Sequence, residues 1–358
     1  PSDQGDWSIG PQNLLADSLW NQVEIRMNDT VILGGMTGYG YLSMMNILLD
    51  ENPVSDEELQ CAMFYKDTAG FLGDMSLSDS GNNAGFKKRA ELMKKSRSVE
   101  LRSRLQADVC RVNNYLINGV DVDITLFPTT AAFRLMTVNQ KKRDYFLEIQ
   151  DVSLLVKQVT PSPSVLIGHQ SVMKSQMSRA KYFYLKEDLR KFTLSRQVQS
   201  HFIEDCYNGK IPSTLAIAFV KGSSFLGDIG ENAYEFSHYD INSITVTLSG
   251  TPTPGGPLTF DFDRRKYLKG YCDLYAGKNK GSSHSQRITL EEFPGGYSLF
   301  VVHLNPENRD TYYPTSRDGN VRVEVRFSRA LPHSVILLTR VTYPSHYEID
   351  YQRNVHLT

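Results

Sequence analysis

Apolar and charged residues alternate strictly from Val321 to Phe327, near the end of the chain. A period of two predicts a strand with one buried face and one solvated face. After a break at Leu331-Pro332, the continuous apolar run from Val335 to Leu338 predicts a strand covered on both faces. A third short segment, Tyr347 to Tyr351, is expected to close the chain. The end of the chain is therefore predicted to be packed antiparallel sheet.

The same strand pattern recurs along the chain, and Gly, Pro, Asn and Asp clusters separate the predicted strands. Helices are expected to be few and short, and the one at Ser55 begins with an N-cap residue followed by acids. The further strands are expected at Leu19–Met27, Val120–Leu126, Leu147–Val159 (one or two strands), Leu215–Phe219, Ile244–Leu248 and Tyr297–Leu304. The helices are expected at Ser55–Lys66, Asn83–Lys95, Gly168–Ala180 and Arg264–Ala276. The predicted fold class is all-β.

With 358 residues, the chain is too long for one ordinary β-sandwich and suits two domains. Pro161 and Pro163 break strand pairing and mark the best boundary. We expect a first sandwich over residues 1–160, a linker and short helix over 161–180, and a second sandwich over 181–358. No internal repeat of about 20 to 50 residues is visible, which argues against propellers and solenoids.

Composition narrows the function classes. The formal net charge of -1 argues against a protein whose main role is to coat nucleic acid. No apolar run approaches the roughly 18 residues of a membrane span. The four cysteines lie far apart, so neither a disulfide scaffold nor a zinc site built on close pairs is expected.

Candidate chemistry is sparse. The eight histidines form no H-x-H or H-E-x-x-H pattern, so structural or surface roles are favoured. Asp261 and Asp263 could bind calcium or act as an acid and base, but a solvated strand face beside Arg264 is the favoured interpretation. The glycine-rich stretch from Gly34 to Gly40 matches no phosphate-binding motif and is expected to be a flexible loop. No catalytic residue, metal ligand or cofactor is predicted.

One basic run is a candidate binding surface, because its bases are opposed only by Glu91 and Glu100. One interpretation is a patch that contacts packaged DNA or an acidic partner through salt-sensitive contacts. The other is a solvated helix face with salt bridges between subunits, which is favoured because the rest of the chain balances the charge. The eight bases are Lys87, Lys88, Arg89, Lys94, Lys95, Arg97, Arg102 and Arg104.

Sequence segments spread over nearly the whole chain carry a family resemblance through their order and spacing. In the first part they are GPQNLLADSLWNQVEIRMND (10–29), FYKDTAG (64–70), KKRAELMKKS (87–96) and YLINGVDVDITL (115–126). In the second part they are SPSVLIGH (162–169), YEFSHYDINSITVTLSG (234–250), GGYSLFVVHLNPE (295–307), GNVRVEVRFSRALPHSVILLTRVTY (319–343) and EIDYQRNV (348–355). With these segments the chain resembles the double jelly-roll major capsid proteins of Polinton/Maverick-type elements and adintoviruses.

The resemblance implies two tandem jelly-roll β-sandwiches with short helices in inserted loops. It implies a homotrimer that forms a pseudo-hexagonal capsomer of an icosahedral shell, made and assembled inside a host cell. The implied partners are other copies of the chain, a penton-type single jelly-roll protein, minor capsid proteins and packaged DNA on the inner face. The family has β-rich sequence before the segment at Gly10, whereas nine residues precede it here. The first jelly roll is therefore expected to lack its opening strands, through truncation or because another chain supplies them.

Two other function classes stay open. One is a tandem β-sandwich that binds glycans or acts as an attachment protein, and the other is a jelly-roll enzyme, which the missing histidine pattern disfavours. For the capsid protein, the expected subunit contacts lie in the long loops Met36–Ser80, Asp261–Arg287 and Asn305–Asp318.

Overall fold

A computed structural model describes residues 9–49, 54–112, 114–138, 145–175, 177–276, 287–304 and 318–357. The strands are β1 (Ile9–Pro11), β2 (Trp20–Met27), β3 (Thr30–Leu33), β4 (Val122–Pro128), β5 (Leu135–Thr137), β6 (Ala180–Leu194), β7 (Ser200–Lys210), β8 (Thr214–Lys221), β9 (Ile241–Leu248), β10 (Thr251–Thr259), β11 (Phe300–His303), β12 (Asp318–Phe327), β13 (Val335–Ile349) and β14 (Val355–Leu357). The helices are α1 (Leu15–Ser18), α2 (Tyr39–Leu48), α3 (Asp56–Cys61), α4 (Ala84–Leu92), the 3-10 turn η1 (Asp108–Arg111), α5 (Ala131–Arg134), α6 (Pro163–Ser175), α7 (Gly222–Leu226) and α8 (Leu268–Asp273). The prediction of a β fold with short helices in its loops is confirmed.

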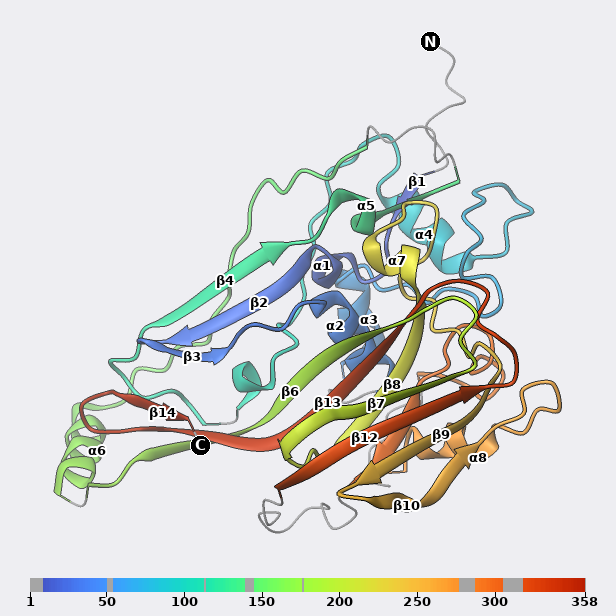
Figure 1. Cartoon of the computed structure of the whole chain (residues 1–358). Coiled ribbons are helices and arrows are strands. Elements are labelled where there is room, and N and C mark those ends of the chain that lie inside the picture. The colour runs from blue at the N-terminus through green and yellow to red at the C-terminus, as the bar shows by residue number, and fades with distance from the viewer. Residues whose placement is uncertain are drawn as a thin grey trace.

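The eight strands from β6 to β13 form two sheets that pack face to face (Figure 1). One sheet has the order β11-β8-β13-β6 and the other the order β10-β9-β12-β7, with every neighbouring pair antiparallel. Counted along the chain, the first, eighth, third and sixth strands share one sheet, and the second, seventh, fourth and fifth share the other. This order is that of a jelly roll, a double Greek key. The C-terminal half of the chain is therefore a complete jelly roll.

Strand β13 is the central strand of this half. It pairs with β6 from Val335 to Ile349 and with β8 from Val335 to Thr342. Its first eight residues are all buried, as the apolar run predicted. The expected separate segment at Tyr347–Tyr351 is wrong, because Tyr347 to Ile349 end β13 itself and the chain closes with β14. Pro344 has no backbone N–H to donate, but it fits within β13 because β8 has ended by this point. Only β6 remains beside it, so fewer backbone hydrogen bonds are required there.

Strand β12 shows the alternation that its sequence predicted. Val321, Val323 and Val325 are buried, while the residues between them are partly exposed. The strand lies between β7 and β9 in the second sheet, and its buried face packs into the interior shared with the sheet of β13. Burial on one face and hydrogen bonds on both edges fix its register.

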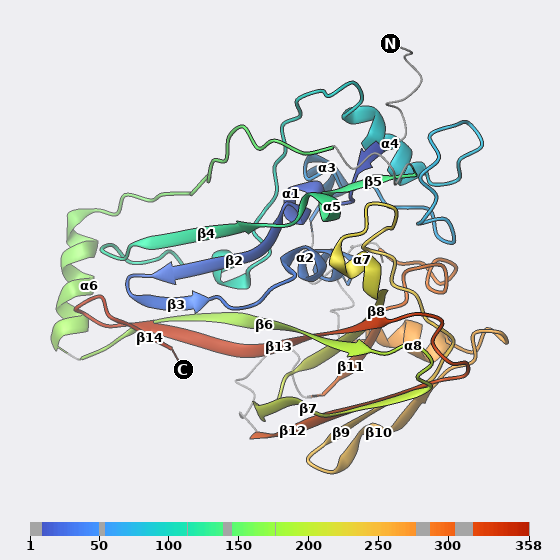
Figure 2. The same cartoon turned by 45° about the horizontal axis from the view of Figure 1, so that its top comes forward.

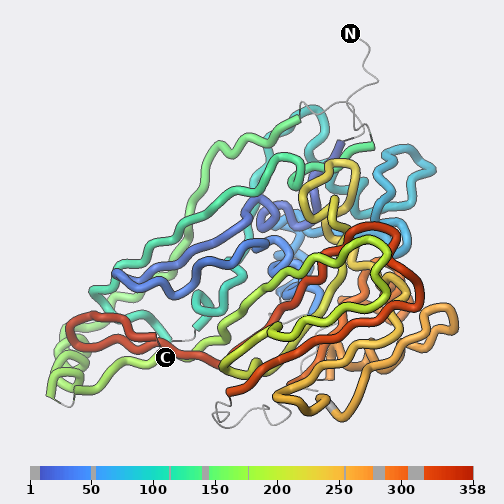
Figure 3. The backbone as a smooth tube through the Cα atoms, viewed as in Figure 1, coloured from blue at the N-terminus to red at the C-terminus, as the bar shows by residue number. Residues whose placement is uncertain are grey.

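The N-terminal half has less sheet. Strands β3, β2 and β4 form a three-stranded sheet in that order, and β1 pairs with β5. Helices α1 to α4 lie between this sheet and the jelly roll or at its end (Figures 1 and 2). The backbone then passes to the C-terminal half through α6 (Figure 3).

Helix α2 corrects two loop predictions. All ten of its residues are buried, so Met36–Ser80 is not one exposed loop, and the glycine-rich stretch ends inside a helix at Gly40. A Cβ atom on Gly40 would lie 2.6 Å from the Tyr234 hydroxyl, which explains a glycine within the first turn. Asn46 of α2 donates to Glu187, which forms a buried ion pair with Arg340 of β13 at 2.6 Å. This contact fastens α2 to the jelly roll.

The other helices begin or end away from the predicted limits. Helix α3 starts where expected, since the Ser55 hydroxyl accepts from the Glu58 amide, but it ends at Cys61. Helix α6 begins at Pro163, a residue that suits the first turn of a helix. Helix α8 covers only the middle of the predicted Arg264–Ala276.

The predicted strand or strands at Leu147–Val159 are wrong for the structure described. Every residue of this segment lacks regular structure, and all of them except the half-buried Leu147 are exposed. Leu154, Leu155 and Val156 are 58%, 77% and 66% exposed. The segment has the alternation of a strand, but no described strand is hydrogen-bonded to it. A strand needs a neighbour for its backbone groups, and here none is in place.

Candidate functional site

The basic run divides into three parts. Lys87, Lys88 and Arg89 lie on α4, Lys94 and Lys95 follow its end, and the three arginines from 97 to 104 lie in the irregular segment that leads to η1. Five of the eight side chains are exposed, two are half-buried and one, Arg89, is buried. The exposed five are Lys88, Lys95, Arg97, Arg102 and Arg104. The run is thus a partial surface patch.

Several of these bases have partners within the chain. Lys94 pairs with Glu91 at 3.3 Å, and Arg104 forms two hydrogen bonds with Glu58. The ammonium of Lys88 lies 5.9 Å from the centre of the Tyr65 ring. Exposed pairs of this kind contribute at most about 1 kcal/mol, so they leave the bases available to a stronger partner.

Arg89 has a different role from its neighbours. Its guanidinium forms an ion pair with Asp67 at 2.9 Å, with the two side chains 0% and 2% exposed. It also donates to the carbonyls of Pro11, at 3.1 Å, and Tyr65, at 2.7 Å. A buried, paired arginine of this kind is a structural group and does not belong to the surface patch.

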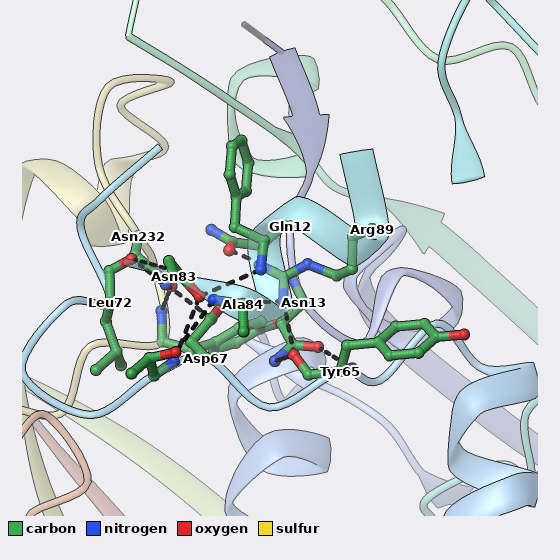
Figure 4. Close-up of polar contacts among 12 residues, drawn as sticks. Gln12, Asn13, Tyr65, Asp67, Leu72, Asn83, Ala84, Arg89 and Asn232 are labelled. Carbon is green, nitrogen blue, oxygen red and sulfur yellow. Dashed lines mark hydrogen bonds and ion pairs between the residues drawn. The ribbon is translucent and has the colours of Figure 1, made fainter. Parts of the chain in front are cut away.

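Arg89 and Asp67 are the centre of a buried polar cluster (Figure 4). Asn83 caps α4 by accepting from the Phe86 amide and donates to the Leu72 carbonyl. Asn232, from the jelly-roll half, donates to Asp67 at 3.0 Å and to the same Leu72 carbonyl. The cluster therefore ties α4 and the loop at Asp67–Leu72 to the C-terminal half. Sequence reasoning missed it, because its members are spread from residue 12 to residue 232.

We predict that Arg89→Met lowers the free energy of unfolding by about 3–5 kcal/mol, because it leaves the buried Asp67 carboxylate without its cationic partner. Lys88→Met, one residue earlier on the exposed face of α4, is the matched control and should change stability by less than about 0.5 kcal/mol. Urea denaturation of both variants measures the difference. Equal stability of the two variants would contradict the structural role of Arg89.

A second buried carboxyl lies at Asp17, on α1. It accepts hydrogen bonds from Ser103, at 2.6 Å, and from Tyr39, at 3.2 Å. Burial raises the pKa of Asp17 to about 6, while these hydrogen bonds and the Arg111 charge act in the opposite direction. The Tyr39 hydroxyl also accepts from the Gln106 amide, so this cluster holds the segment after the basic run against α2.

The raised pKa of Asp17 predicts a loss of stability as pH rises. Between about pH 4 and pH 6 the folded protein holds a proton that the unfolded chain has released, so the free energy of unfolding falls across that window and is level above it. Because the pKa of Asp17 is raised by about two units, the free energy of unfolding should fall by about 3 kcal/mol across this window. Asp17→Asn, which stays neutral, should match the unmodified protein near pH 4 and exceed its stability at pH 7.

Urea denaturation from pH 4 to pH 7.5 tests this prediction. Asp74→Asn is the control, because backbone amides of Asn82 and Ser76 lower the pKa of Asp74, so the effect of this substitution on stability should be nearly constant above about pH 5. A stability difference between Asp17→Asn and the unmodified protein that does not change with pH would contradict the account.

The remaining candidates do not converge on a site. The expected strand face at Asp261 and Asp263 is wrong, because Asp261 opens a turn and accepts from the Arg264 amide, while Asp263 pairs with Arg329. Among the described residues, no three His, Cys, Asp or Glu side chains are placed to hold a metal ion. His284 and most of the loop Asn305–Asp318 lie outside the described residues. In the described part of the chain, no helix is long and apolar enough to span a membrane.

One stretch of the chain carries many exposed apolar side chains. It runs from Phe146 along the unpaired segment to α6, where Met173 is the one buried residue among those described in the helix. Figures 1 and 2 place this stretch at the outer side of β4, where no other labelled element covers it. Its large exposed apolar side chains are Phe146, Ile149, Val152, Leu154, Leu155, Val156, Val159, Val165, Ile167 and Val172. Large apolar side chains left in water along a stretch of this length are typical of a surface that contacts other protein.

Comparison with known proteins gives one curated relative and several solved structures. No family model matches the chain. The uncharacterized protein F54H12.2 of Caenorhabditis elegans is 19% identical over 351 residues, which cover 96% of this chain and 80% of that protein.

The similar solved structures are viral coat proteins. The mavirus major capsid protein matches with a TM-score of 0.47 and 10% identity, over 100% of this chain and 80% of that one. The Sputnik virophage structure matches with a TM-score of 0.46 and 10% identity, over 98% of this chain and 76% of that one. The assignment of a jelly roll to the C-terminal half follows from the strand order described above.

Proposed function

We propose that the protein is a structural subunit of a viral capsid, and that it acts by packing against other subunits. The observation that carries the proposal is the extended apolar surface from Phe146 to Val172, presented on a chain whose other half is a jelly roll. Jelly rolls are common building blocks of viral capsids. A surface of this kind serves assembly, since a lone soluble chain would leave it in water.

In its finer form the proposal adopts what the family resemblance implies. The subunit is a major capsid protein of the Polinton and adintovirus type. Its first jelly roll, without the opening strands, covers residues 1–160, a linker and short helix cover 161–180, and its second jelly roll covers 181–358. Three copies form a pseudo-hexagonal capsomer of an icosahedral shell. A penton-type single jelly-roll protein and minor capsid proteins complete the virion, which is assembled inside the host cell. Assembly by packing needs no catalytic residue or cofactor.

The native mass in solution tests the proposal. Light scattering after size exclusion should give about three times the 40.5 kDa of the chain, and negative-stain images of the same peak should show hexagonal tiles or shells. A monomer that binds glycans on an array would contradict the capsid proposal and favour an attachment protein.

We propose that the basic run, apart from the buried Arg89, contacts DNA on the inner face of the shell. Neutralising Lys94, Lys95 and Arg97 to Gln should leave the oligomer intact and weaken its DNA binding. The slope of log affinity against log salt should fall by up to about 2.7, or roughly 0.9 for each phosphate that the variant no longer neutralises. The control neutralises Arg264, Arg265 and Lys266, three exposed bases of the C-terminal half. Equal DNA binding by both triple variants would contradict the role of the basic run.

A further inference from the structure

A cavity lies between helices α3 and α4 and the segment that joins them. Its volume is about 370 Å³, which is within the usual range for sites that hold small molecules. Its walls come from Asp56 and Gln60 of α3, the segment Phe64–Lys66, the start of α4, and Arg287. Because Arg287 belongs to the C-terminal half, both halves of the chain line the cavity.

Packing fixes the walls at Tyr65 and at the start of α4. A Cβ atom on Gly85 would lie 2.4 Å from the Lys66 carbonyl oxygen, so glycine lets α4 begin directly against this backbone. The Tyr65 carbonyl accepts hydrogen bonds from Arg89, at 2.7 Å, and from Asn13, at 2.9 Å. The buried polar cluster around Arg89 therefore holds the cavity in shape, which is the support that a binding site requires.

Three cations line the cavity, and only part of their charge is neutralised. Lys66 pairs with Glu292 at 2.5 Å, and Arg287 pairs with Asp56. Lys88 has no ion pair with a described residue. The side chains of Lys66 and Arg287 are 26% and 12% exposed, so water screens their charge less than it would at an open surface. A concave site with surplus positive charge favours an anion.

An aromatic wall lies beside these cations. Phe64 is 9% exposed, while Tyr65 is half-buried and its ring points away from the buried polar cluster (Figure 4). The Lys88 ammonium lies 5.9 Å from the centre of the Tyr65 ring, so positive charge and aromatic surface are adjacent. Aromatic side chains stack on nucleic-acid bases, and lysine and arginine bind phosphate. The cavity therefore combines the two kinds of group that recognise a nucleotide.

We propose that this cavity is a nucleotide-binding site. The phosphate contacts Lys66, Lys88 and Arg287, and the base lies against Tyr65. A free nucleotide and the phosphorylated end of a nucleic-acid strand share this chemistry, and binding measurements with both distinguish them. Nucleotide binding does not depend on the proposed capsid role, because the cavity lies within one chain and shares only Lys88 with the basic run.

Calorimetric titration of the 358-residue chain tests the proposal. AMP should bind saturably. Adenosine, which lacks the phosphate, should show no saturable binding, and inorganic phosphate should bind more weakly than AMP because it leaves the aromatic wall uncovered. The absence of saturable AMP binding would overturn the proposal, and so would an equal affinity for AMP and either of the other two compounds.

Two substitutions test whether AMP occupies this cavity. Lys88→Gln removes the cation that has no carboxylate partner, and it should weaken AMP binding on the order of tenfold because a charged hydrogen bond is lost. Gln60→Glu keeps the shape of an exposed side chain and adds negative charge to the wall, so it should weaken AMP binding as well. Lys87→Gln is the matched control, because it removes the same charge one residue away on α4 and outside the cavity. Equal AMP affinity of Lys88→Gln and Lys87→Gln would overturn the assignment.

A short single-stranded oligonucleotide, with or without a terminal phosphate, separates the two sources of the nucleotide. A preference for the phosphorylated oligonucleotide that is lost in Lys88→Gln would identify the end of a strand as the ligand. AMP binding without such a preference would identify a free nucleotide. A trimeric mass without AMP binding would leave the capsid proposal standing, so the two failures are distinguishable.

Discussion

The backbone groups of a strand need partners on both edges when the strand is buried, and the first eight residues of β13 meet this demand. Its 15 residues pair with β6 throughout, and its first eight also pair with β8. Because β13 is the last long strand and β6 the first of the jelly roll, their pairing closes the C-terminal half. Arg340 of β13 forms an ion pair with Glu187 of β6, and Asn46 of α2 donates a hydrogen bond to the same Glu187 carboxylate. The attachment of α2, and through it much of the N-terminal half, depends on that closure.

In the N-terminal half the same demand is not met. Its hairpin β2–β3 and the strand β4 beside it are formed, but Leu147–Val159 has no strand neighbour among the described residues and stays irregular. The helices of this half are nevertheless firmly packed, since α2 is buried throughout and the Arg89–Asp67 cluster joins α4 to Asn232. The result is a chain with a finished sandwich, a packed helical layer and an uncovered apolar surface. That combination is the physical reason for proposing that the protein acts within an assembly.

Much of the C-terminal half could be predicted from the sequence, because alternation in β12 and the apolar run in β13 report directly which faces are buried. The same alternation at Leu147–Val159 led to a wrong prediction, because a pattern specifies what a strand would bury but cannot supply its neighbour. Helix α2 was missed because it is a helix whose sequence lacks the expected pattern. It is apolar on all sides, so it has no amphipathic period, and its Gly40 suggested a loop.

The candidate site was predictable only in part. The basic run was visible as a cluster of charge, but its sequence could not show that Arg89 turns inward to Asp67 while Lys88 beside it stays exposed. The buried polar cluster joins residues more than two hundred positions apart, which no local pattern records. The raised pKa of Asp17 was equally hidden from the sequence, because the hydrogen-bond partners Tyr39 and Ser103 come from separate segments of the chain.

Amide hydrogen exchange of the 358-residue chain tests the central claim most directly, namely that β13 is paired within a closed jelly roll whereas Leu147–Val159 has no strand neighbour among the described residues. The account predicts that Val335–Ile349 exchanges among the slowest parts of the chain, and that Leu147–Val159 exchanges near the rate of an unstructured peptide. Comparable protection of the two segments in the isolated monomer would contradict it, because Leu147–Val159 would then have strand partners within its own chain.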